Sequence, residues 1–246
     1  MQIHLLKTRL VNSYIVEYPD QLFVIDVAAG CHDHVAAFIT GKLGRALDEI
    51  KLIVCTHDDP DHLGGLRALA ASCGASICIP YASKSLHRKV LNDPQAFFFR
   101  FATAFRESLR ARTWDMYSNP ERSNKTRAEI ESLQQSTNLN LPKKKFSQDR
   151  IKDNEALPMF DDWKLLHTPG HSWDSCCYYH ESTETLISGD TLLGSRKRGH
   201  LVPPAILANP RHLKRSYHKL SKLKIRRVFP GHGSMIEGNN LVHRRL

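Results

Sequence analysis

Long hydrophobic runs are missing from this sequence of 246 residues. The longest apolar stretches, such as residues 52–55, are far shorter than the roughly 20 residues that a membrane-spanning helix requires. The first nine residues lack the basic start and the continuous apolar stretch of a secretory signal. From these absences we expect a cytoplasmic protein with no membrane partner.

Cysteine and repetitive sequence are also scarce. Six cysteines, most of them inside apolar runs, are too few for a disulfide framework in a chain of this length, so we expect reduced and mostly buried thiols. No internal repeat or low-complexity tract is present, and 41% hydrophobic with 24% charged residues is typical of a globular protein with one sizeable core. Disordered, collagen-like and coiled-coil proteins are thereby excluded.

Acidic residues are nearly absent from the last part of the chain. From Arg196 onward there are thirteen lysine and arginine residues and one acidic residue, Glu237, so this stretch carries a net charge of +12. The preceding 195 residues carry −2, because the whole chain carries +10. Such an asymmetry favours an anionic substrate or a nucleic acid as a partner.

Short apolar runs alternate with helical patterns in the first and last thirds of the chain. Strands are predicted near residues 14–17, 22–26, 51–56, 76–79, 163–168, 175–180, 185–188 and 227–229. Helices are predicted near residues 32–47, 63–71 and 211–223. This alternation indicates a layered α/β fold.

The middle of the chain, from about residue 83 to 154, has helical signals and no strand signals. A helix should begin at Pro94, with Asp93 as its cap, and it carries Phe97, Phe98, Phe101, Phe105 and Leu109 on one face. A second helix is predicted near residues 125–135. We interpret the chain as a single domain, residues 1–246, with a helical insertion or lid at about 83–154. The phenylalanine face is expected to pack the insertion onto the main core, with a pocket wall or a dimer contact as alternatives.

The strongest functional signal is the polar segment 56–65, which directly follows a predicted buried strand. It contains His57, Asp59, Asp61 and His62, and gathering such side chains at a strand end is costly unless a positive charge compensates them. A metal ion supplies that charge. In a tight loop, alternate side chains can converge on one point.

Three further predicted strands end in a group that can bind a metal. These groups are His171, Asp190 and His232. Neutral imidazole and carboxylate are the ligands expected for zinc or a related divalent metal, and together with the first segment they are enough for two ions.

With these four motifs in this order, the chain resembles the metallo-β-lactamase-fold hydrolase superfamily. The resemblance implies a four-layer αββα sandwich with a two-metal site. It also implies that His57, Asp59 and His171 hold one metal and Asp61, His62 and His232 the other. Asp190 would bridge the two ions, and Asp26, which ends an apolar run, would support the site without ligating.

One position departs from the HxHxDH pattern of that family. Asp59 stands at the second histidine, which gives an HxDxDH variant and offers the metal a harder oxygen ligand. We expect two divalent ions, most simply zinc, with iron or manganese as alternatives. The chain looks like a glyoxalase II-like or lactonase-like member and not a true β-lactamase. Asp190 stands where zinc β-lactamases commonly present cysteine, and His62 is a histidine additional to their site.

The expected reaction is attack by a metal-bridging hydroxide, oriented by Asp61, on a small ester, thioester or lactone. A phosphodiesterase or nuclease is the main alternative because of the basic last third. That third has no basic motif interleaved with aromatic residues, and its basic helix is more typical of a solvated face. A metal-dependent redox or binding role without hydrolysis is a third interpretation. The substrate is expected to be a small anionic or acyl compound, and a homodimer is an open alternative.

Five residues near the motifs are candidates for binding the substrate. They are Tyr81, Arg196, Lys197, Arg198 and His200, placed there by their closeness in sequence to the ligand segments.

Overall fold

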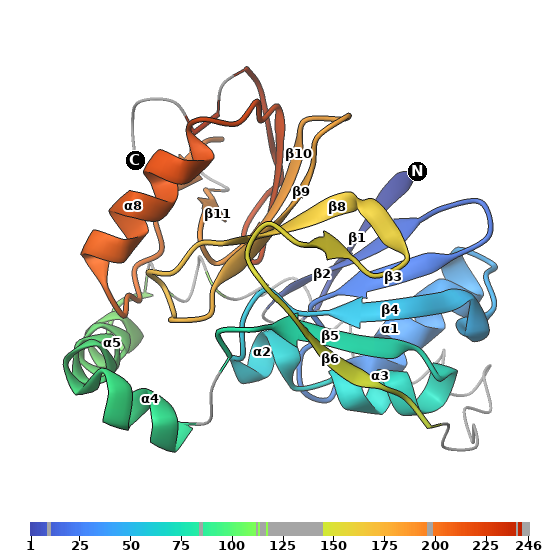
Figure 1. Cartoon of the computed structure of the whole chain (residues 1–246), viewed down its shortest axis with the longest axis horizontal. Coiled ribbons are helices and arrows are strands. Elements are labelled where there is room, and N and C mark those ends of the chain that lie inside the picture. Colours follow the sequence, from blue (N-terminus) through green and yellow to red (C-terminus); the bar gives the residue numbers. More distant parts are fainter. Residues whose placement is uncertain are drawn as a thin grey trace. The chain divides into compact units, whose positions relative to one another are not determined.

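The computed structural model describes residues 1–8, 11–83, 86–111, 113, 117, 145–195, 199–239 and 241–242. It divides into two compact units, the first formed by Met1–Ile79 and Ser118–Arg150 and the second by Pro80–Tyr117 and Ile151–Leu246. Each unit is built on a six-stranded sheet, and the two sheets are drawn with their helices in Figure 1. The mixed α/β fold predicted from the sequence is therefore confirmed.

The sheet of the first unit combines antiparallel and parallel pairs. Its strands, in sheet order, are β1 (Gln2–Lys7), β2 (Asn12–Glu17), β3 (Leu22–Ile25), β4 (Ile50–Val54), β5 (Ser76–Pro80) and β6 (Gln148–Ile151). Neighbours β1 to β3 are antiparallel, whereas β3, β4 and β5 run parallel. Parallel neighbours need crossover connections, and helices supply them.

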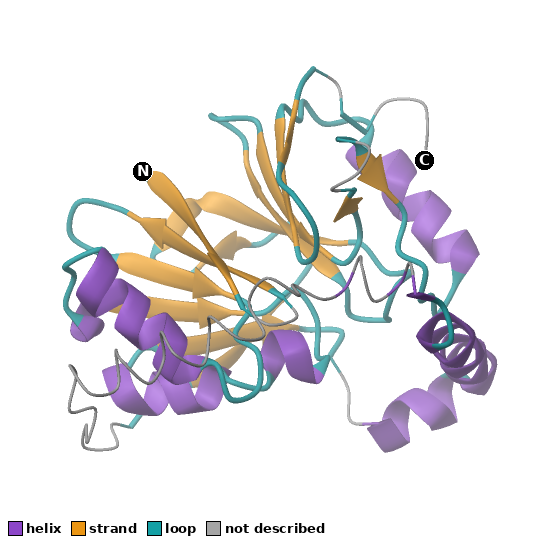
Figure 2. Cartoon of the chain, turned by 180° about the vertical axis from the view of Figure 1, so that it is seen from behind, coloured by secondary structure: helices purple, strands orange, loops and turns teal. Residues whose placement is uncertain are grey.

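The helices of the first unit cover one face of that sheet. They are α1 (His32–Ala37), a π-helical turn (Phe38–Lys42), a 3₁₀ turn (Leu47–Glu49), α2 (Pro60–Leu63) and α3 (Leu66–Cys73). Val35 and Leu69 of α1 and α3 are fully buried against Val24 and Ile53 of the strands. Figure 2 shows these helices gathered beside their strands.

The second unit repeats this plan. Its sheet, in order, consists of β14 (Ile236–Glu237), β13 (Arg227–Pro230), β10 (Thr185–Gly189), β9 (Cys176–His180), β8 (Phe160–His167) and β7 (Ala156–Leu157), and a two-stranded ribbon is formed by β11 (Leu193–Gly194) and β12 (Leu201–Val202). Strands β10 and β13 are parallel, and helix α8 (Pro210–Leu220) lies between them in the chain. Leu213, Tyr217 and Leu220 of α8 are buried in the core of this unit.

Parallel pairing places the carboxyl ends of neighbouring strands together within each unit. In the first unit, the backbone N–H of Asp26, just after β3, donates to the carbonyl of Val54 at the end of β4. In the second, the N–H of Gly231, just after β13, donates to the carbonyl of Gly189 at the end of β10. The segments that follow these strands carry the candidate ligands, so the topology explains why they lie near one another in each unit.

The insertion contributes two helices to the second unit, α4 (Leu86–Asn92) and α5 (Pro94–Ser108), drawn in green in Figure 1. As predicted, α5 begins at Pro94, and the Asp93 carboxylate accepts a hydrogen bond from the Ala96 N–H at 2.9 Å. The helix expected near 125–135 lies outside the described residues. Strand β6 is a correction, because the sequence showed no strand signal before residue 154; polar, exposed Gln148 and Asp149 explain the weak pattern.

The phenylalanine face of α5 is exposed, which corrects the interpretation that it packs against the core. Phe98, Phe101 and Phe105 are between 62% and 66% exposed, and Leu109 is 74% exposed. The opposite face, which includes Ala96, Thr103 and Glu107, is the buried one. Polar anchors on that face determine the orientation: Thr103 bonds to the backbone of Leu207, and Arg106, Arg110 and Thr113 contact the carboxylate of Glu107.

None of the helices in the described ranges has the length and apolar character needed to traverse a bilayer.

Candidate metal centre

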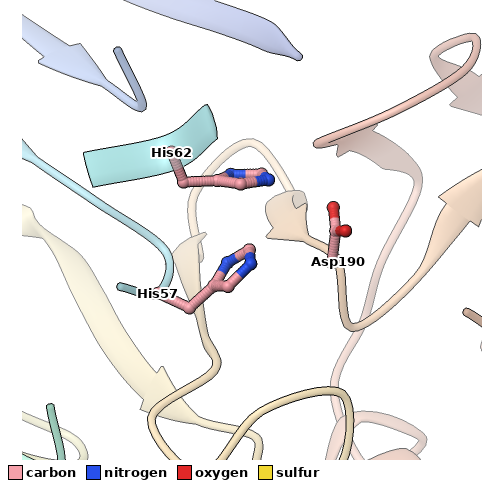
Figure 3. A group of neighbouring side chains, drawn as sticks. All are labelled: His57, His62 and Asp190. Atoms are coloured by element: carbon pink, nitrogen blue, oxygen red, sulfur yellow. The ribbon is translucent and has the colours of Figure 1, made fainter. Parts of the chain in front are cut away.

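The first set of candidate ligands lies in the first unit, on the loop and short helix that follow β4. Proline at the first position of α2 and an extended Asp59 before it end the loop and start the helix. The imidazole rings of His57 and His62 lie side by side (Figure 3), and the distance between their centroids is 4.0 Å. Both histidines are fully buried, whereas the side chains of Asp59 and Asp61 are 24% and 27% exposed.

Each histidine of this set is paired with one aspartate. His57 Nε2 lies 3.2 Å from Asp59 Oδ2, and His62 Nε2 lies 3.7 Å from Asp61 Oδ2. In each pair the imidazole is buried and the carboxylate is partly exposed. The first unit thus presents two separate imidazole and carboxylate pairs.

The second set lies in the second unit and centres on one carboxylate. Asp190 Oδ2 is 3.7 Å from His171 Nε2 and 3.4 Å from His232 Nε2. All three side chains are buried, with at most 3% exposed. One carboxylate oxygen therefore lies close to the Nε2 atoms of two histidines.

These separations fit metal ligands better than hydrogen bonds. Two donors about 2.1 Å from a tetrahedral ion are about 3.4 Å apart. Hydrogen bonds from N–H to oxygen are about 2.7–3.2 Å long, so three of the four distances exceed that range and the His57 distance is at its upper end. The donor set, neutral imidazole with carboxylate, suits zinc, iron or manganese.

Asp26 holds the His62 ring by its other nitrogen. The Asp26 carboxylate, fully buried, accepts from His62 Nδ1 at 2.8 Å, from the Thr56 N–H at 2.7 Å and from the Thr56 hydroxyl at 2.9 Å. Since a carboxylate oxygen accepts, Nδ1 carries the proton and Nε2 presents a lone pair. A carboxylate behind a histidine in this way orients it for metal binding.

The backbone of Ile206 acts in the same way on His171. Its carbonyl oxygen accepts from His171 Nδ1 at 2.8 Å, so the Nε2 of His171 is also the unprotonated nitrogen. The loop that contains Ile206 is also held to the segment before His171, because the Ala208 N–H donates to the Gly170 carbonyl at 2.9 Å. Both histidines therefore have the tautomer that a metal needs.

Glycines allow the ligand segments to approach their neighbours closely. The Gly65 N–H donates to the Val27 carbonyl at 2.8 Å, and a Cβ added at Gly65 would lie 2.5 Å from the carbonyl oxygen of Ala28. Gly233, next to His232, has φ +86°, and a Cβ there would lie 1.7 Å from the carbonyl oxygen of Gly194. A side chain at either position would displace the backbone beside a candidate ligand.

The remaining predicted residues lie on the surface or outside the described ranges. Tyr81 is 59% exposed, with the Lys152 ammonium 5.7 Å from its ring centroid. His200 is exposed, and its carbonyl accepts from the Ser195 N–H. Arg196, Lys197 and Arg198 lie outside the residues that the structure describes.

Two residues near the candidate ligands were not predicted from the sequence. Arg100 of α5 places Nη2 3.3 Å from His171 Nε2, and the Tyr117 ring meets the His232 ring edge-on at 4.7 Å. Arg100 had only a weak signal, since a charged residue among Phe97, Phe98, Phe99 and Phe101 is equally expected to face solvent. Tyr117 had none.

The cysteines are free and mostly buried. All six are free thiols, and five are buried, as predicted. Burial raises the pKa of Cys177 to about 11, so its thiolate is rare at neutral pH.

A family model described as the metallo-beta-lactamase superfamily matches residues 6–232. This chain belongs to that superfamily. Superfamily membership supports the assignment of a metal-dependent hydrolase, which the clustered imidazoles and carboxylates of each unit also favour.

Curated relatives match short segments of this superfamily member. An atrochrysone carboxyl ACP thioesterase of Aspergillus fumigatus is 32% identical over 74 residues, which is 30% of this chain and 21% of that protein. A probable metallo-hydrolase, YqjP of Bacillus subtilis, is 28% identical over 91 residues, 35% of this chain and 28% of its own length. The matches thus span less than a third of each relative.

Solved structures resemble the chain over almost its whole length. The metallo-beta-lactamase family protein TTHA1429 of Thermus thermophilus has a TM-score of 0.62 at 21% identity, covering 96% of this chain and 74% of that one. TTHA1623, solved in a di-iron-bound form, has a TM-score of 0.56 at 22% identity, covering 96% and 94%. At these identities the likeness establishes the fold, and the predicted metallo-β-lactamase sandwich fold is confirmed.

Proposed function

We propose that this protein is a two-metal hydrolase of small esters, thioesters or lactones. In this proposal Asp190 is shared by two ions, and the remaining ligands form two groups: His57, Asp59 and His171, and Asp61, His62 and His232. The observation that carries the proposal is the spacing of the imidazole and carboxylate pairs. The first unit offers two such pairs, and the second places one carboxylate oxygen near two histidines, as a shared ligand requires.

Zinc is the proposed metal, with iron or manganese as alternatives. Four imidazoles favour zinc, whereas the carboxylate of Asp59 adds a harder ligand that iron and manganese also accept. A solved relative of the same fold is described in a di-iron-bound form, which keeps iron among the alternatives.

The chain's own residues prepare the site for hydrolysis. Two divalent ions, when bound, would lower the pKa of water and polarise the carbonyl oxygen of the substrate. Asp61, which is partly exposed, orients the attacking water and accepts its proton. Asp26 and the carbonyl of Ile206 keep the Nε2 atoms of His62 and His171 unprotonated and correctly directed.

The ester and thioester class has one further support. The curated relative from Aspergillus fumigatus is named a thioesterase, and its matched segment is 32% identical. The phosphodiesterase alternative draws on the basic last third, but in α8 the residues Arg211, Lys214 and Arg215 form an exposed face opposite the buried one. A solvated face of this kind is the simpler explanation of the charge.

Metal analysis combined with a substrate screen tests the proposed function. Purified protein should contain two divalent ions per chain and should hydrolyse a thioester, ester or lactone faster than a phosphodiester. Stoichiometric metal without any hydrolysis would favour the redox or binding alternative. Protein that takes up no metal under any loading condition would refute the proposal.

Asp59 provides a test of metal selectivity. We expect Asp59→His to retain both metals and to shift the preference toward zinc, because a nitrogen ligand replaces an oxygen. Asp59→Ala should lose about one ion per chain while the other stays bound. Elemental analysis after loading with equimolar zinc, iron and manganese measures both effects, and unchanged metal content in Asp59→Ala would show that Asp59 is not a ligand.

The nuclease alternative predicts a steep dependence of RNA affinity on salt. Each phosphate contact contributes a slope of roughly −0.7 to −0.9 in a plot of log affinity against log salt. We expect weak, non-specific binding instead, because α8 has no interleaved aromatic residues on its basic face. Fluorescence anisotropy with labelled RNA between about 50 and 200 mM salt measures the slope. Sub-micromolar affinity with metal-dependent cleavage would favour the nuclease.

A further inference from the structure

Arg100 is a charged residue of the phenylalanine-rich helix α5, and it lies on the side of the helix that is buried. It lies on α5 in helical register with Ala96, Thr103 and Glu107, which are buried, and it is itself half-buried. The exposed phenylalanines occupy the opposite side. The helix therefore directs this guanidinium toward the buried side of α5, where it reaches His171.

The same short loop fixes both α5 and the His171 ring. The Thr103 hydroxyl donates to the Leu207 carbonyl, and the Leu207 N–H approaches the Thr103 oxygen, each at 3.1 Å. The neighbouring carbonyl, that of Ile206, accepts from His171 Nδ1 at 2.8 Å. The position of Arg100 relative to His171 is thus set by hydrogen bonds on both sides, and its Nη2 lies 3.3 Å from His171 Nε2.

A guanidinium beside a metal ligand has a specific chemical consequence. His171 Nε2 is the unprotonated nitrogen, so it accepts from Arg100 in this structure and presents the same lone pair to an ion. Arginine stays protonated at any physiological pH, so binding of a cation at His171 leaves two positive charges close together. An anion placed between them relieves the repulsion, and the planar guanidinium fits carboxylate and phosphate oxygens.

We infer that Arg100 binds an anionic group, a carboxylate or a phosphate, of the substrate. The inference rests on the proposed function and narrows its substrate class to acyl compounds that carry a negative charge. Arg100 is then a specificity-determining residue that acts through direct contact with substrate.

Anion binding to metal-loaded protein provides the test. Isothermal titration with inorganic phosphate and, separately, with succinate distinguishes the two anion classes. For the preferred anion, Arg100→Ala should weaken binding about 10- to 100-fold, the usual loss for a hydrogen-bonded charge. The anion affinity of Arg100→Lys should lie between those of the parent and Arg100→Ala. Guanidinium ion at tens of millimolar should restore part of the anion affinity that Arg100→Ala loses. Arg88→Ala, which removes an exposed arginine of helix α4, is the control and should bind like the parent.

Metal affinity separates substrate binding from a structural role. Removing a cation beside His171 should leave metal affinity unchanged or raise it severalfold, so Arg100→Ala should lose anion binding without losing metal. If parent and Arg100→Ala both took up metal and bound the anion with equal affinity, the inference about Arg100 would be wrong and the proposed function would stand. Parallel losses of metal and anion in both Arg100 variants would also overturn it, because they indicate a structural role. Failure of the parent to take up metal would instead overturn the proposed function and the inference with it.

Discussion

Asp190→Asn should remove most of the bound metal and reduce hydrolysis on the order of 10²–10³-fold, the size of effect seen when one transition-state contact is lost. Asp190 Oδ2 lies near the Nε2 atoms of both His171 and His232, and in the proposed centre this carboxylate is shared by two ions. Asparagine keeps the size of the side chain but not its charge. Elemental analysis and hydrolysis rates of the purified variant measure the two effects.

The matched control for this variant is Asp162→Asn. Asp162 is also paired with a histidine of the second unit, since its Oδ2 lies 3.0 Å from His180 Nε2, an ordinary hydrogen-bond distance. Its replacement should leave the metal content and the rate at the parental values. If Asp190→Asn kept two ions per chain while its circular dichroism matched the parent, the shared-ligand assignment would be wrong.

The four central strands of each sheet were predictable from the sequence, whereas the edge strands β1, β6, β7 and β14 were not. Apolar runs ending in polar residues correspond to β3, β4, β10 and β13, and parallel pairing brings the ends of β3 and β4, and of β10 and β13, together. This follows because alternation of strands and helices predicts parallel neighbours, whose carboxyl ends share an edge. The residues after those ends are therefore grouped by topology before any side-chain contact is considered.

The orientation of α5 was not predictable from its pattern. Five apolar residues on one face predict a buried face, but Phe101 and Leu109 are exposed. Hydrogen bonds and ion pairs of Thr103 and Glu107, made with residues distant in sequence or beyond the helix end, determine which side packs. Hydrophobic periodicity predicts that a helix has an apolar and a polar face. In α5 the polar contacts determine which of the two faces is buried.

The role of Arg100 was hidden for the same reason. A lone arginine within a phenylalanine run is interpreted as a solvated residue until the packing face is known. The hydrogen bond between Thr103 and Leu207 determines which face of α5 is buried, and on that face Arg100 lies next to His171. By contrast, the supporting position of Asp26 was anticipated from the resemblance to the superfamily. The pairing of β3 with β4 brings this residue next to Thr56.

Asp26→Ala should lower both stability and metal affinity. The variant leaves three buried donors without their acceptor: the Thr56 N–H, the Thr56 hydroxyl and His62 Nδ1. With a cost of roughly 1–3 kcal/mol for each lost buried partner and some relaxation, the free energy of unfolding should fall by about 2–4 kcal/mol. Loss of the carboxylate behind His62 should weaken metal binding about 10- to 100-fold. Denaturant unfolding with a chelator present and competition titration with a metal indicator measure the two quantities separately.

Asp26→Asn separates the support of His62 from the support of the fold. Asp26 has φ +59°, a left-handed conformation that asparagine adopts readily and alanine does not. The amide oxygen can still accept from the Thr56 N–H, so stability should fall by only about 1 kcal/mol. Its NH₂ group cannot accept from His62 Nδ1, so metal affinity should fall nearly as far as in the alanine variant. Asp33→Ala, which changes a partly exposed aspartate of α1, should alter neither quantity. If Asp26→Asn bound metal as tightly as the parent, Asp26 would stabilise the loop alone and His62 would keep its orientation without it.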